Sequence, residues 1–274
     1  MSRPPVLFIS HGAPTYALAP GLAGAQLGAL GRALPSPRAV LIVSPHWTTR
    51  ETQVGAALRP ETIHDFGGFA PALYEIDYPV PGDFSLASKV RAQLNDSGWP
   101  ATLDERRGLD HGAWVPMRHL YPAADVPTFQ VSMPASLDAA SAYRLGQALA
   151  PLRDEGILII GSGSLTHNLY EFRSSDGAVP EYAQLFTAWI RGAVTTGDHA
   201  RLIRAMEIAP HARRAHPTPE HFLPLLVAAG ASIGEPASVL DGGFTHGVLS
   251  MQSYVFGEPV ACNLTFKSAE ALHA

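Results

Sequence analysis

Three histidines in this chain each follow a short run of apolar residues. His11 comes directly after such a run, His46 comes two residues after another, and His167 ends a glycine- and serine-rich stretch that follows a third. Neutral imidazole is a good ligand for zinc, iron and copper. If the runs are neighbouring parallel strands, their carboxyl ends share the edge of the sheet where ligands bind. The pattern predicts a metal centre held by histidine, although each histidine alone would fit a capping or core position equally well.

A fourth histidine, His221, lies in a segment typical of the start of a helix. Thr218 is expected to cap this helix and Pro219 to take its first position. The positive end of a helix disfavours the imidazolium ion, so His221 would keep the neutral form that metal binding requires. Glu220 is the alternative ligand, because two histidines and a carboxylate form the facial triad of non-haem iron. Successive helical residues point about 100 degrees apart, so only one of the two should face the metal.

Two further histidines stand in settings that suit proton transfer or substrate contact. His111 follows Asp110 and precedes a glycine, which suits a positioned acid or base, while a simple turn is the alternative. His64 and Asp65 lie in a long aromatic loop, where a substrate wall is expected and a solvated loop is the alternative. Four aromatic side chains could also surround a substrate ring, with ordinary packing as their alternative: Trp47, Phe66, Phe69 and Tyr74.

The elements that would position these residues alternate between strands and helices. Continuous apolar runs predict strands that are covered on both faces, at Val6–Ser10, Ala39–Ser44, Thr128–Ser132, Ile157–Ile160 and Val248–Val255. Helical periodicity is found at Phe84–Leu94, Leu137–Arg153 (capped by Ser136), Tyr182–Val194 and His199–Met206. The alternation predicts an α/β fold. We expect a single domain over residues 1–274, with a central largely parallel or mixed sheet flanked by helices on both faces.

Two long irregular stretches interrupt this alternation. The stretch from Pro60 to Gly82 is rich in proline, glycine and aromatic residues, and loops of such length are usually functional or mobile. The stretch from Arg173 to Pro180 is expected to be a surface excursion.

Composition narrows the classes of protein that need to be considered. The chain has 274 residues, of which 46% are hydrophobic and 16% charged, with a net charge of -5, so it is expected to be globular. Nothing in this charge indicates a nucleic-acid partner or an anionic membrane surface, and no run approaches the roughly 18 apolar residues of a membrane span. The N-terminus is not typical of a secretory signal. One cysteine, Cys262, permits no internal disulfide, so a cytoplasmic location is expected. The sequence does not indicate the oligomeric state.

Taken in order, several segments of the chain resemble the DODA-type, class III extradiol aromatic ring-opening dioxygenases. The resemblance runs from about His11 to the C-terminal strand, and the ordered set is more specific than any one motif. The segments that carry it are Ser10–Pro14, Ser44–Trp47, Ile63–Phe69, Tyr78–Gly82, Leu109–Trp114, Gly161–Asn168 and His216–His221.

The resemblance implies a specific role for each of the histidines. It implies a metal held at His11, His46 and His221, with His167 as a further ligand or as the catalytic acid/base. His111 is expected to contact the substrate and to be the other candidate acid/base. His64 and Trp47 are expected to line the substrate site. Ring opening requires iron(II), whereas zinc is a plausible bound metal because some members of the family are seen with zinc.

The expected reaction is the extradiol cleavage of a small aromatic diol by O2. A neutral His167 or His111 would remove a proton from the catechol, and the ring would open beside the diol to give a yellow muconic semialdehyde. A zinc-dependent hydrolase is the alternative function, with Glu220 or Asp110 as the base for a metal-bound water. A non-catalytic binding protein on the same fold is the second alternative. Oxygen dependence distinguishes the dioxygenase from the hydrolase.

Overall fold

The computed structural model describes residues 3–173 and 177–258, and all its strands and helices lie within these ranges. The strands are β1 Val6–Ser10, β2 Ala39–Thr49, β3 Thr52–Gly55, β4 Ala101–Asp104, β5 Thr128–Pro134, β6 Ile157–Gly163, β7 Ala237–Leu240, β8 Phe244–Thr245, β9 Leu249–Ser250 and β10 Ser253–Phe256. The α-helices are α1 Gly21–Ala33, α2 Phe84–Asp96, α3 His111–Leu120, α4 Ala139–Leu149, α5 Glu181–Thr195, α6 His199–Ile203, α7 Ala205–Ile208, α8 Ala212–Ala215 and α9 Leu223–Ala231. Short 3-10 helices lie at Pro14–Ala17, Pro71–Leu73, Ala150–Glu155 and Leu169–Glu171.

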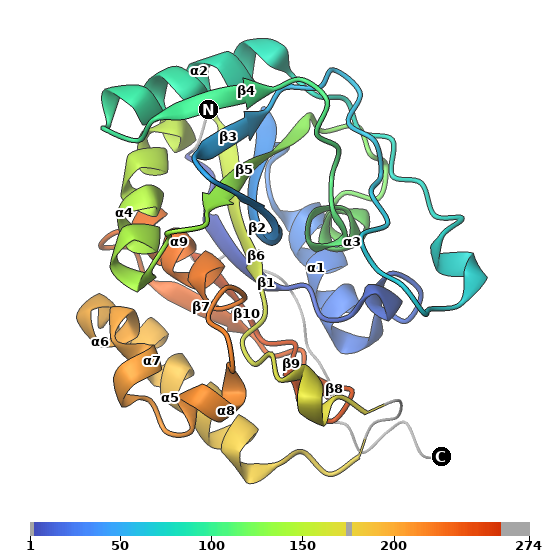
Figure 1. Ribbon diagram of the computed structural model, residues 1–274, viewed down its shortest axis with the longest axis vertical. Helices are drawn as coiled ribbons and strands as arrows, with labels where there is room; N and C mark the ends of the chain where they lie inside the picture. Colours follow the sequence, from blue (N-terminus) through green and yellow to red (C-terminus); the bar gives the residue numbers. More distant parts are fainter. Residues whose placement is uncertain (1–2, 174–176, 259–274) are drawn as a thin grey trace.

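The main sheet has eight strands in the order β4-β3-β5-β2-β6-β1-β10-β7 (Figure 1). The four central strands, β5, β2, β6 and β1, are parallel to one another. Antiparallel pairs join β10 to β1 and β3 to β5, so the sheet as a whole is mixed. Because β2, β6 and β1 are parallel neighbours, their carboxyl ends meet at one edge, as the sequence predicts.

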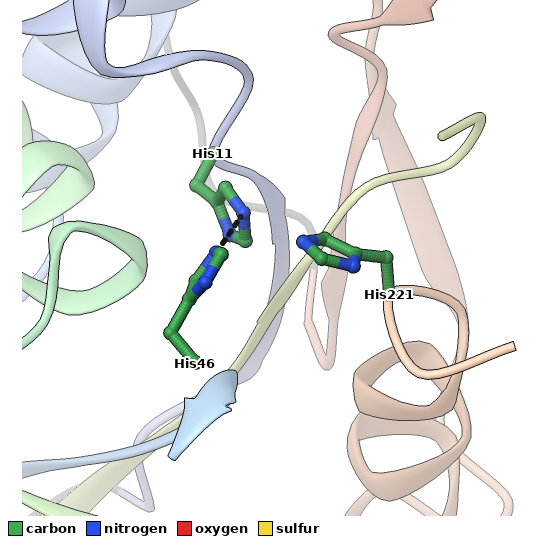
Figure 2. Close-up of side chains that lie close together, drawn as sticks. All are labelled: His11, His46 and His221. Carbon is green, nitrogen blue, oxygen red and sulfur yellow. Dashed lines mark hydrogen bonds between the residues drawn. The ribbon is translucent and has the colours of Figure 1, made fainter. Parts of the chain in front are cut away.

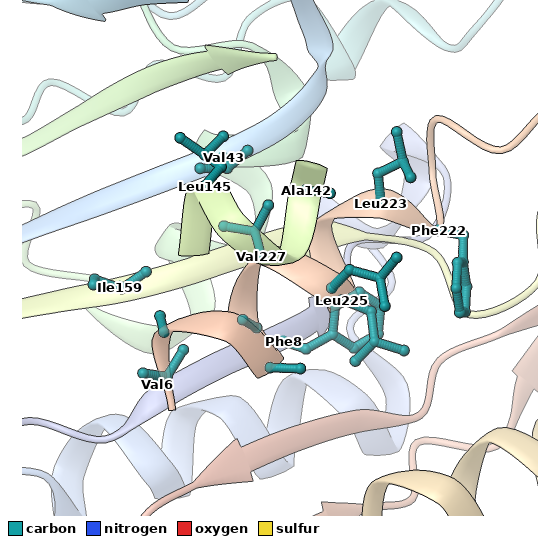
Figure 3. Close-up of a cluster of buried hydrophobic side chains, with 14 of the residues drawn as sticks. Val6, Phe8, Val43, Ala142, Leu145, Ile159, Phe222, Leu223, Leu225 and Val227 are labelled. Atoms are coloured by element: carbon teal, nitrogen blue, oxygen red, sulfur yellow. The ribbon is translucent and has the colours of Figure 1, made fainter. Parts of the chain in front are cut away.

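Helices cover both faces of this sheet. Residues alternate between the faces along each strand, so Val6 and Phe8 belong to one hydrophobic cluster and Leu7 and Ile9 to the other. Figure 1 shows α2, α4 and α9 on one face and α1 and α3 on the opposite face. Figure 3 shows the larger cluster, where side chains of α4 and α9 meet those of the central strands. The predicted α/β class, with helices on both faces, is confirmed.

Helix α9 lies so close to β6 that two glycines are required between them. A Cβ atom added at Gly161 would lie 2.0 Å from the Pro224 carbonyl oxygen, and one at Gly163 would lie 2.3 Å from the His221 carbonyl oxygen. Both obstacles are backbone atoms, which cannot rotate away as a flexible side chain could. The Ser164 amide also donates to the His221 carbonyl at 2.9 Å. The sheet edge therefore fixes the turn that carries His221.

Replacing Gly161 with alanine is expected to destabilise the fold by at least about 3 kcal/mol, because the clash forces α9 away from the sheet. Urea denaturation would measure this loss. Gly192→Ala is the matched control, since Gly192 lies in α5 with no heavy atom near its added Cβ. Alanine there should stabilise the protein by up to about 1 kcal/mol. Equal stabilities of the Gly161 variant and the wild type would contradict this account of the packing.

Several sequence-based boundaries are wrong. The predicted helix Leu137–Arg153 is shorter, because its cap is Asp138 rather than Ser136 and the helix tightens into a 3-10 turn at Ala150. Pro151 explains the change, since proline has no amide hydrogen to continue the α-helical pattern. The predicted helix His199–Met206 is divided into α6 and α7 at Arg204.

The helix expected to start at Thr218 begins later, at Leu223, with Phe222 at its cap. Pro224, rather than Pro219, occupies its first turn. His221 therefore lies in the turn before α9 and not within the helix, and the helical spacing of Glu220 and His221 does not apply.

At the C-terminal end, the predicted strand Val248–Val255 is two strands, β9 and β10. The strand β9 pairs with β8 in a separate two-stranded sheet, whereas β10 pairs with β1 and β7 in the main sheet. The short strands β3, β4 and β7 and the helices α1 and α3 have no counterpart in the sequence-based prediction. Within the described residues, no helix combines the length and the apolarity needed to cross a bilayer. Cys262 and part of the predicted surface excursion, residues 174–176, lie outside the described residues.

Candidate metal centre

Three histidines converge from separate elements at the carboxyl edge of the sheet (Figure 2). His11 follows β1, His46 lies in β2 within an irregularity in its pairing with β5, and His221 lies in the turn before α9. One ring nitrogen from each lies within 4.8 Å of the other two. The Nε2 atoms of His11 and His46 are 3.2 Å apart. Two nitrogen ligands of a tetrahedral metal are separated by roughly 3.3 Å, so this spacing suits a shared ion.

Hydrogen bonding fixes which nitrogen of His11 carries the proton. The Ser162 hydroxyl donates its single hydrogen to the carbonyl of Gly112. It must therefore accept from His11 Nδ1, which lies 3.0 Å away. With the proton on Nδ1, the Nε2 atom of neutral His11 presents a lone pair to His46 and His221.

The same argument applies to His221. Its Nδ1 donates to the Glu220 carboxylate at 3.1 Å, since a carboxylate can only accept. Its Nε2 atom is buried and has no hydrogen-bond partner among the described residues. A buried polar atom without a partner costs free energy, and a metal ion bound to the lone pair removes that cost.

His46 is held in a comparable way by the loop opposite. Its Nδ1 lies 3.5 Å from the Asp65 carboxylate, which favours the proton on that nitrogen. The Nε2 lone pairs of His11 and His46 then face each other at 3.2 Å and repel unless a cation binds them. The donor set therefore fits a metal, with each ligand nitrogen opposed by a hydrogen-bonded or charged partner on the other side of the ring.

Burial keeps all three rings neutral. Loss of solvent lowers the pKa of His11 and of His221 well below the ordinary value. For His46, burial and then repulsion from His111 lower the pKa to about 3. Neutral imidazole is the form that binds metals, so protons compete weakly for this site at neutral pH.

Asp65 holds His111 beside the three ligands. Its carboxylate accepts from the His111 backbone amide at 2.8 Å and from Nδ1 at 3.0 Å. Burial raises the pKa of Asp65, but the hydrogen bonds from His111 outweigh it and lower the pKa to about 2. The ring of His111 lies 4.0 Å from that of His46 between centroids. The hydrogen bond to Asp65 thereby fixes a proton on Nδ1 of His111.

Replacing Asp65 with asparagine is expected to weaken metal binding by about 10- to 100-fold, because the charge behind His46 is lost. Competition with a coloured chelator would measure the affinity. Asp77→Asn is the matched control: this carboxylate lies in the same long loop but accepts from Thr62, at 2.7 Å, instead of from a histidine. Similar affinities for the two variants would show that Asp65 does not support the ligands.

His167 occupies a different position from the other three. Its ring stacks on His221 with centroids 3.5 Å apart and planes 7° from parallel. Its ring nitrogen groups with Glu220 and His221 rather than with His11 and His46. Burial lowers its pKa, so it is neutral and able to accept a proton. The structure therefore brings His167 to the site but not into the set of three converging nitrogens.

A cavity of about 320 Å³ opens onto the histidines. It is lined by His11, His46, His111, His167 and His221, by Gly12, Ala13 and Pro14, and by Phe66, Phe69, Leu169, Phe172 and Leu249. Small-molecule sites are typically such mostly apolar clefts with a few convergent polar groups. The aromatic wall expected at Phe66 and Phe69 is present, whereas Phe172, Leu169 and Leu249 were not singled out from the sequence.

Other predicted residues lie outside this lining. His64 packs behind Phe66 and bonds to the Ile76 carbonyl at 3.0 Å. Trp47 is buried under the guanidinium of Arg107, 5.2 Å from the centre of its ring. Neither His64 nor Trp47 lines the cavity, and Tyr74 does not either. Their aromatic character suggested contact with a substrate, but packing against their own neighbours accounts for it.

The two carboxylates proposed as bases for a metal-bound water both accept hydrogen bonds from neighbouring side chains. Asp110 is fully buried and accepts from Ser44, Arg107 and Gln130. Burial raises its pKa, although these hydrogen bonds oppose the shift. Glu220 accepts from His221 and from Thr218. Glu220 therefore hydrogen-bonds to Nδ1 of His221, on the other side of that ring from the buried Nε2.

His216 supports the segment that leads to His221. It is 2% exposed and its Nε2 donates to the Leu165 carbonyl at 2.9 Å. Burial lowers its pKa to about 4. In the unfolded chain the pKa returns to about 6.5, so below that pH the unfolded state binds a proton that the folded state does not. Stability is therefore lost as pH falls from about 6.5 to about 4.

The variant His216→Gln keeps a donor for Leu165 but cannot titrate. Between about pH 7 and about pH 5, it should lose about 2 kcal/mol less unfolding free energy than the wild type. Denaturant titrations of metal-free protein at both pH values would measure this. If the variant and the wild type lose the same unfolding free energy between these pH values, His216 does not titrate with folding.

Comparisons with known proteins agree with this site. The family model described as "Catalytic LigB subunit of aromatic ring-opening dioxygenase" matches residues 6–257. A protein of Beta vulgaris named "4,5-DOPA dioxygenase extradiol" is 40% identical over 91% of this chain and 95% of its own length. A protein of the same name from Escherichia coli K12 is 40% identical over 93% of this chain and 96% of its own length. The crystal structure of an uncharacterized Escherichia coli K12 protein superimposes with a TM-score of 0.78 at 34% identity, covering 93% of this chain and all of the other.

These matches decide between the functions that the sequence left open. The resemblance to extradiol ring-opening dioxygenases is confirmed, and with it the prediction of a metal-dependent oxidoreductase that uses O2 on an aromatic ring. The zinc hydrolase is not favoured. Since the family match spans nearly the whole described chain, the protein belongs to the family of catalytic LigB subunits of aromatic ring-opening dioxygenases.

Proposed function

We propose that this site holds iron(II) on His11, His46 and His221 and opens the ring of a catechol with O2 by extradiol cleavage. The observation that carries the proposal is the convergence of three ring nitrogens beside a mostly apolar cavity of about 320 Å³, which is large enough to hold a small aromatic ring. Bound iron(II) would bring the diol and O2 together and relay electron density between them. The same nitrogens also suit zinc(II), which metal analysis of the purified protein would distinguish.

The other two histidines of the cavity supply proton transfer in this proposal. His167 is neutral and lines the cavity next to His221, where it can take a proton from a substrate hydroxyl. His111 presents Nε2 because its Nδ1 proton is bound to Asp65. We assign the acid/base role to His167 and the substrate contact to His111.

The aromatic wall orients the ring and excludes water. Phe66 and Phe69 meet edge to face, with centroids 5.6 Å apart, and Phe66 also lies edge-on to His111 at 5.7 Å. A flat substrate ring placed against these faces would point its diol toward the three ligand nitrogens. Exclusion of water also strengthens the hydrogen bonds of His111 and His167 to the substrate.

The decisive experiment is anaerobic loading with iron(II), followed by oxygen uptake in the presence of a panel of catechols that includes DOPA and protocatechuate. DOPA belongs in the panel because the relatives carry it in their names. We expect stoichiometric oxygen consumption and a yellow product with at least one catechol, and none with zinc-loaded protein. If iron-loaded protein leaves every catechol unchanged, the proposal is wrong.

We propose further that residues 1–274 act as one catalytic unit and that the protein works in the reducing cytoplasm. A reducing environment keeps iron in the ferrous form that the reaction needs. The small aromatic diol and O2 would be its partners in the reaction.

A further inference from the structure

We infer that the site selects uncharged catechols with an apolar ring substituent over catechols that carry a carboxylate. The inference rests on the proposed function, because it assumes that the diol lies at the three histidines. The new element is the set of residues that surround the part of the ring away from the diol.

The cavity walls away from the metal ligands are apolar. Besides small residues, the side chains that form them are Pro14, Phe66, Phe69, Leu169, Phe172 and Leu249. No lysine, arginine, aspartate or glutamate lines the cavity in the part of the chain that the structure describes. A substituent that projects from the substrate ring therefore meets carbon atoms and no charged partner.

Charges just outside the cavity do not favour an anion. The two carboxylates behind the histidines, Asp65 and Glu220, are negative and hydrogen-bond to ring nitrogens. Together they balance the charge of a divalent metal ion, so the centre has no surplus positive charge for a second carboxylate.

The arginines near the site interact with other protein groups and do not reach into the cavity. Arg107 donates to Asp110 and to the His46 carbonyl beneath the site. Arg214 pairs with Glu171, at 2.7 Å, and lies over the ring of Tyr182. Arg173 packs along Gly247 and does not line the cavity.

Arg50 and Arg213 are exposed and do not line the cavity either. None of these five cations reaches the position of a ring substituent.

A carboxylate placed against these walls would lose its water without gaining a partner, which is strongly unfavourable. An isopropyl group has the same number of heavy atoms and would instead bury apolar surface. We therefore expect the catechol bearing an isopropyl group to bind at least about 10-fold more tightly than protocatechuate, which bears a carboxylate at the same ring position. The methyl ester of protocatechuate, which is polar but uncharged, should bind with intermediate affinity.

Calorimetric titration of zinc-loaded protein without oxygen would measure these affinities independently of turnover. DOPA, which carries a carboxylate and an ammonium group, should also bind less tightly than the isopropyl catechol. Equal or tighter binding of protocatechuate would overturn the inference, and so would failure of both ligands to bind.

Leu169 offers a sharper test, because it lines the cavity and is also 60% exposed at its mouth. Leu169→Arg should tighten protocatechuate binding by at least about 5-fold, since it supplies the missing cation. Tyr170→Arg is the matched control: Tyr170 is the next residue, is 91% exposed and does not line the cavity. Equal gains in the two variants would indicate a long-range charge effect and would contradict the assignment of Leu169 to the substituent site.

These outcomes separate the inference from the proposed function. Selective binding of the isopropyl catechol, without oxygen consumption by iron-loaded protein, supports the inference and refutes the dioxygenase. Ring opening with a preference for carboxylated catechols supports the dioxygenase and refutes the inference.

Discussion

Replacing His11 with alanine is expected to abolish both metal binding and ring opening. His11 is 1% exposed, and its Nε2 lies 3.2 Å from that of His46. Loss of this atom removes one of the three proposed ligands. Loss of a hydrogen-bond partner behind a ligand already weakens binding by about 10- to 100-fold, so loss of the ligand itself should weaken it by more than about 100-fold.

Metal content after dialysis and oxygen uptake with the best catechol would both be measured for His11→Ala. His199→Ala is the control, because His199 is bonded to Tyr143 at 2.7 Å and lies in α6, away from the cavity. The control should retain metal and activity. Full metal retention by His11→Ala would refute the ligand assignment, and a His46→Ala variant should behave as His11→Ala does.

His167→Ala should retain the metal but lose turnover, whereas His11→Ala should lose both. The His167 ring stacks on His221 and stands outside the group of three ligand nitrogens. A side chain that transfers a proton in the transition state contributes about 10²- to 10⁴-fold to the rate, and we expect a loss of kcat in that range. Metal content should remain close to that of the wild type.

The pH profile and the comparison with His111 make this prediction specific. The acidic limb of the kcat profile should be lost in His167→Ala, because the group that must be neutral has gone. A His111→Gln variant should raise KM more than it lowers kcat if His111 contacts the substrate. Loss of metal from His167→Ala would instead identify His167 as a fourth ligand. A larger fall of kcat in the His111 variant would exchange the two roles.

The hydrogen bonds behind the ligands explain why this site needs so many polar residues in its core. Ser162, Glu220 and Asp65 each face an Nδ1 atom, and each favours the tautomer that leaves Nε2 as a lone pair. Without these partners, the rings could present a proton where a metal requires a lone pair. The tautomers are therefore set by the fold before metal binds, which reduces the reorganisation that binding requires.

Strands with unbroken apolar runs were the part of the fold that local sequence predicted best. Val6–Ser10 is confirmed to the residue, and the other central strands are found with longer C-terminal ends. The register shift that places His46 could not be predicted, because it depends on pairing with β5, far along the chain. Helix α1, rich in alanine and glycine, and α3, which contains Pro116, have weak local signals and are fixed by packing against each other and the sheet.

The sequence also predicted most, but not all, of the residues that line the candidate site. His11, His46, His111, His167 and His221 all line one cavity, as their positions after strands and in ordered motifs indicated. His64 and Trp47 do not line it. Local sequence does not determine whether a side chain in a loop or at a strand end faces the cavity, and these two pack against Phe66 and Arg107 instead. The role of Asp65 was missed, since the only local signal was an acid beside a histidine, and its real partner is His111, 46 residues away.

Fold class, the chemistry of the donors and the family could all be inferred from the chain alone, because apolar periodicity, residue type and motif order are local properties. Folding in three dimensions was needed to establish which three ring nitrogens converge, which histidine lies outside that group and which residues line the cavity. Those facts depend on distances between segments up to 210 positions apart, as between His11 and His221, and only sheet register and helix packing fix such distances.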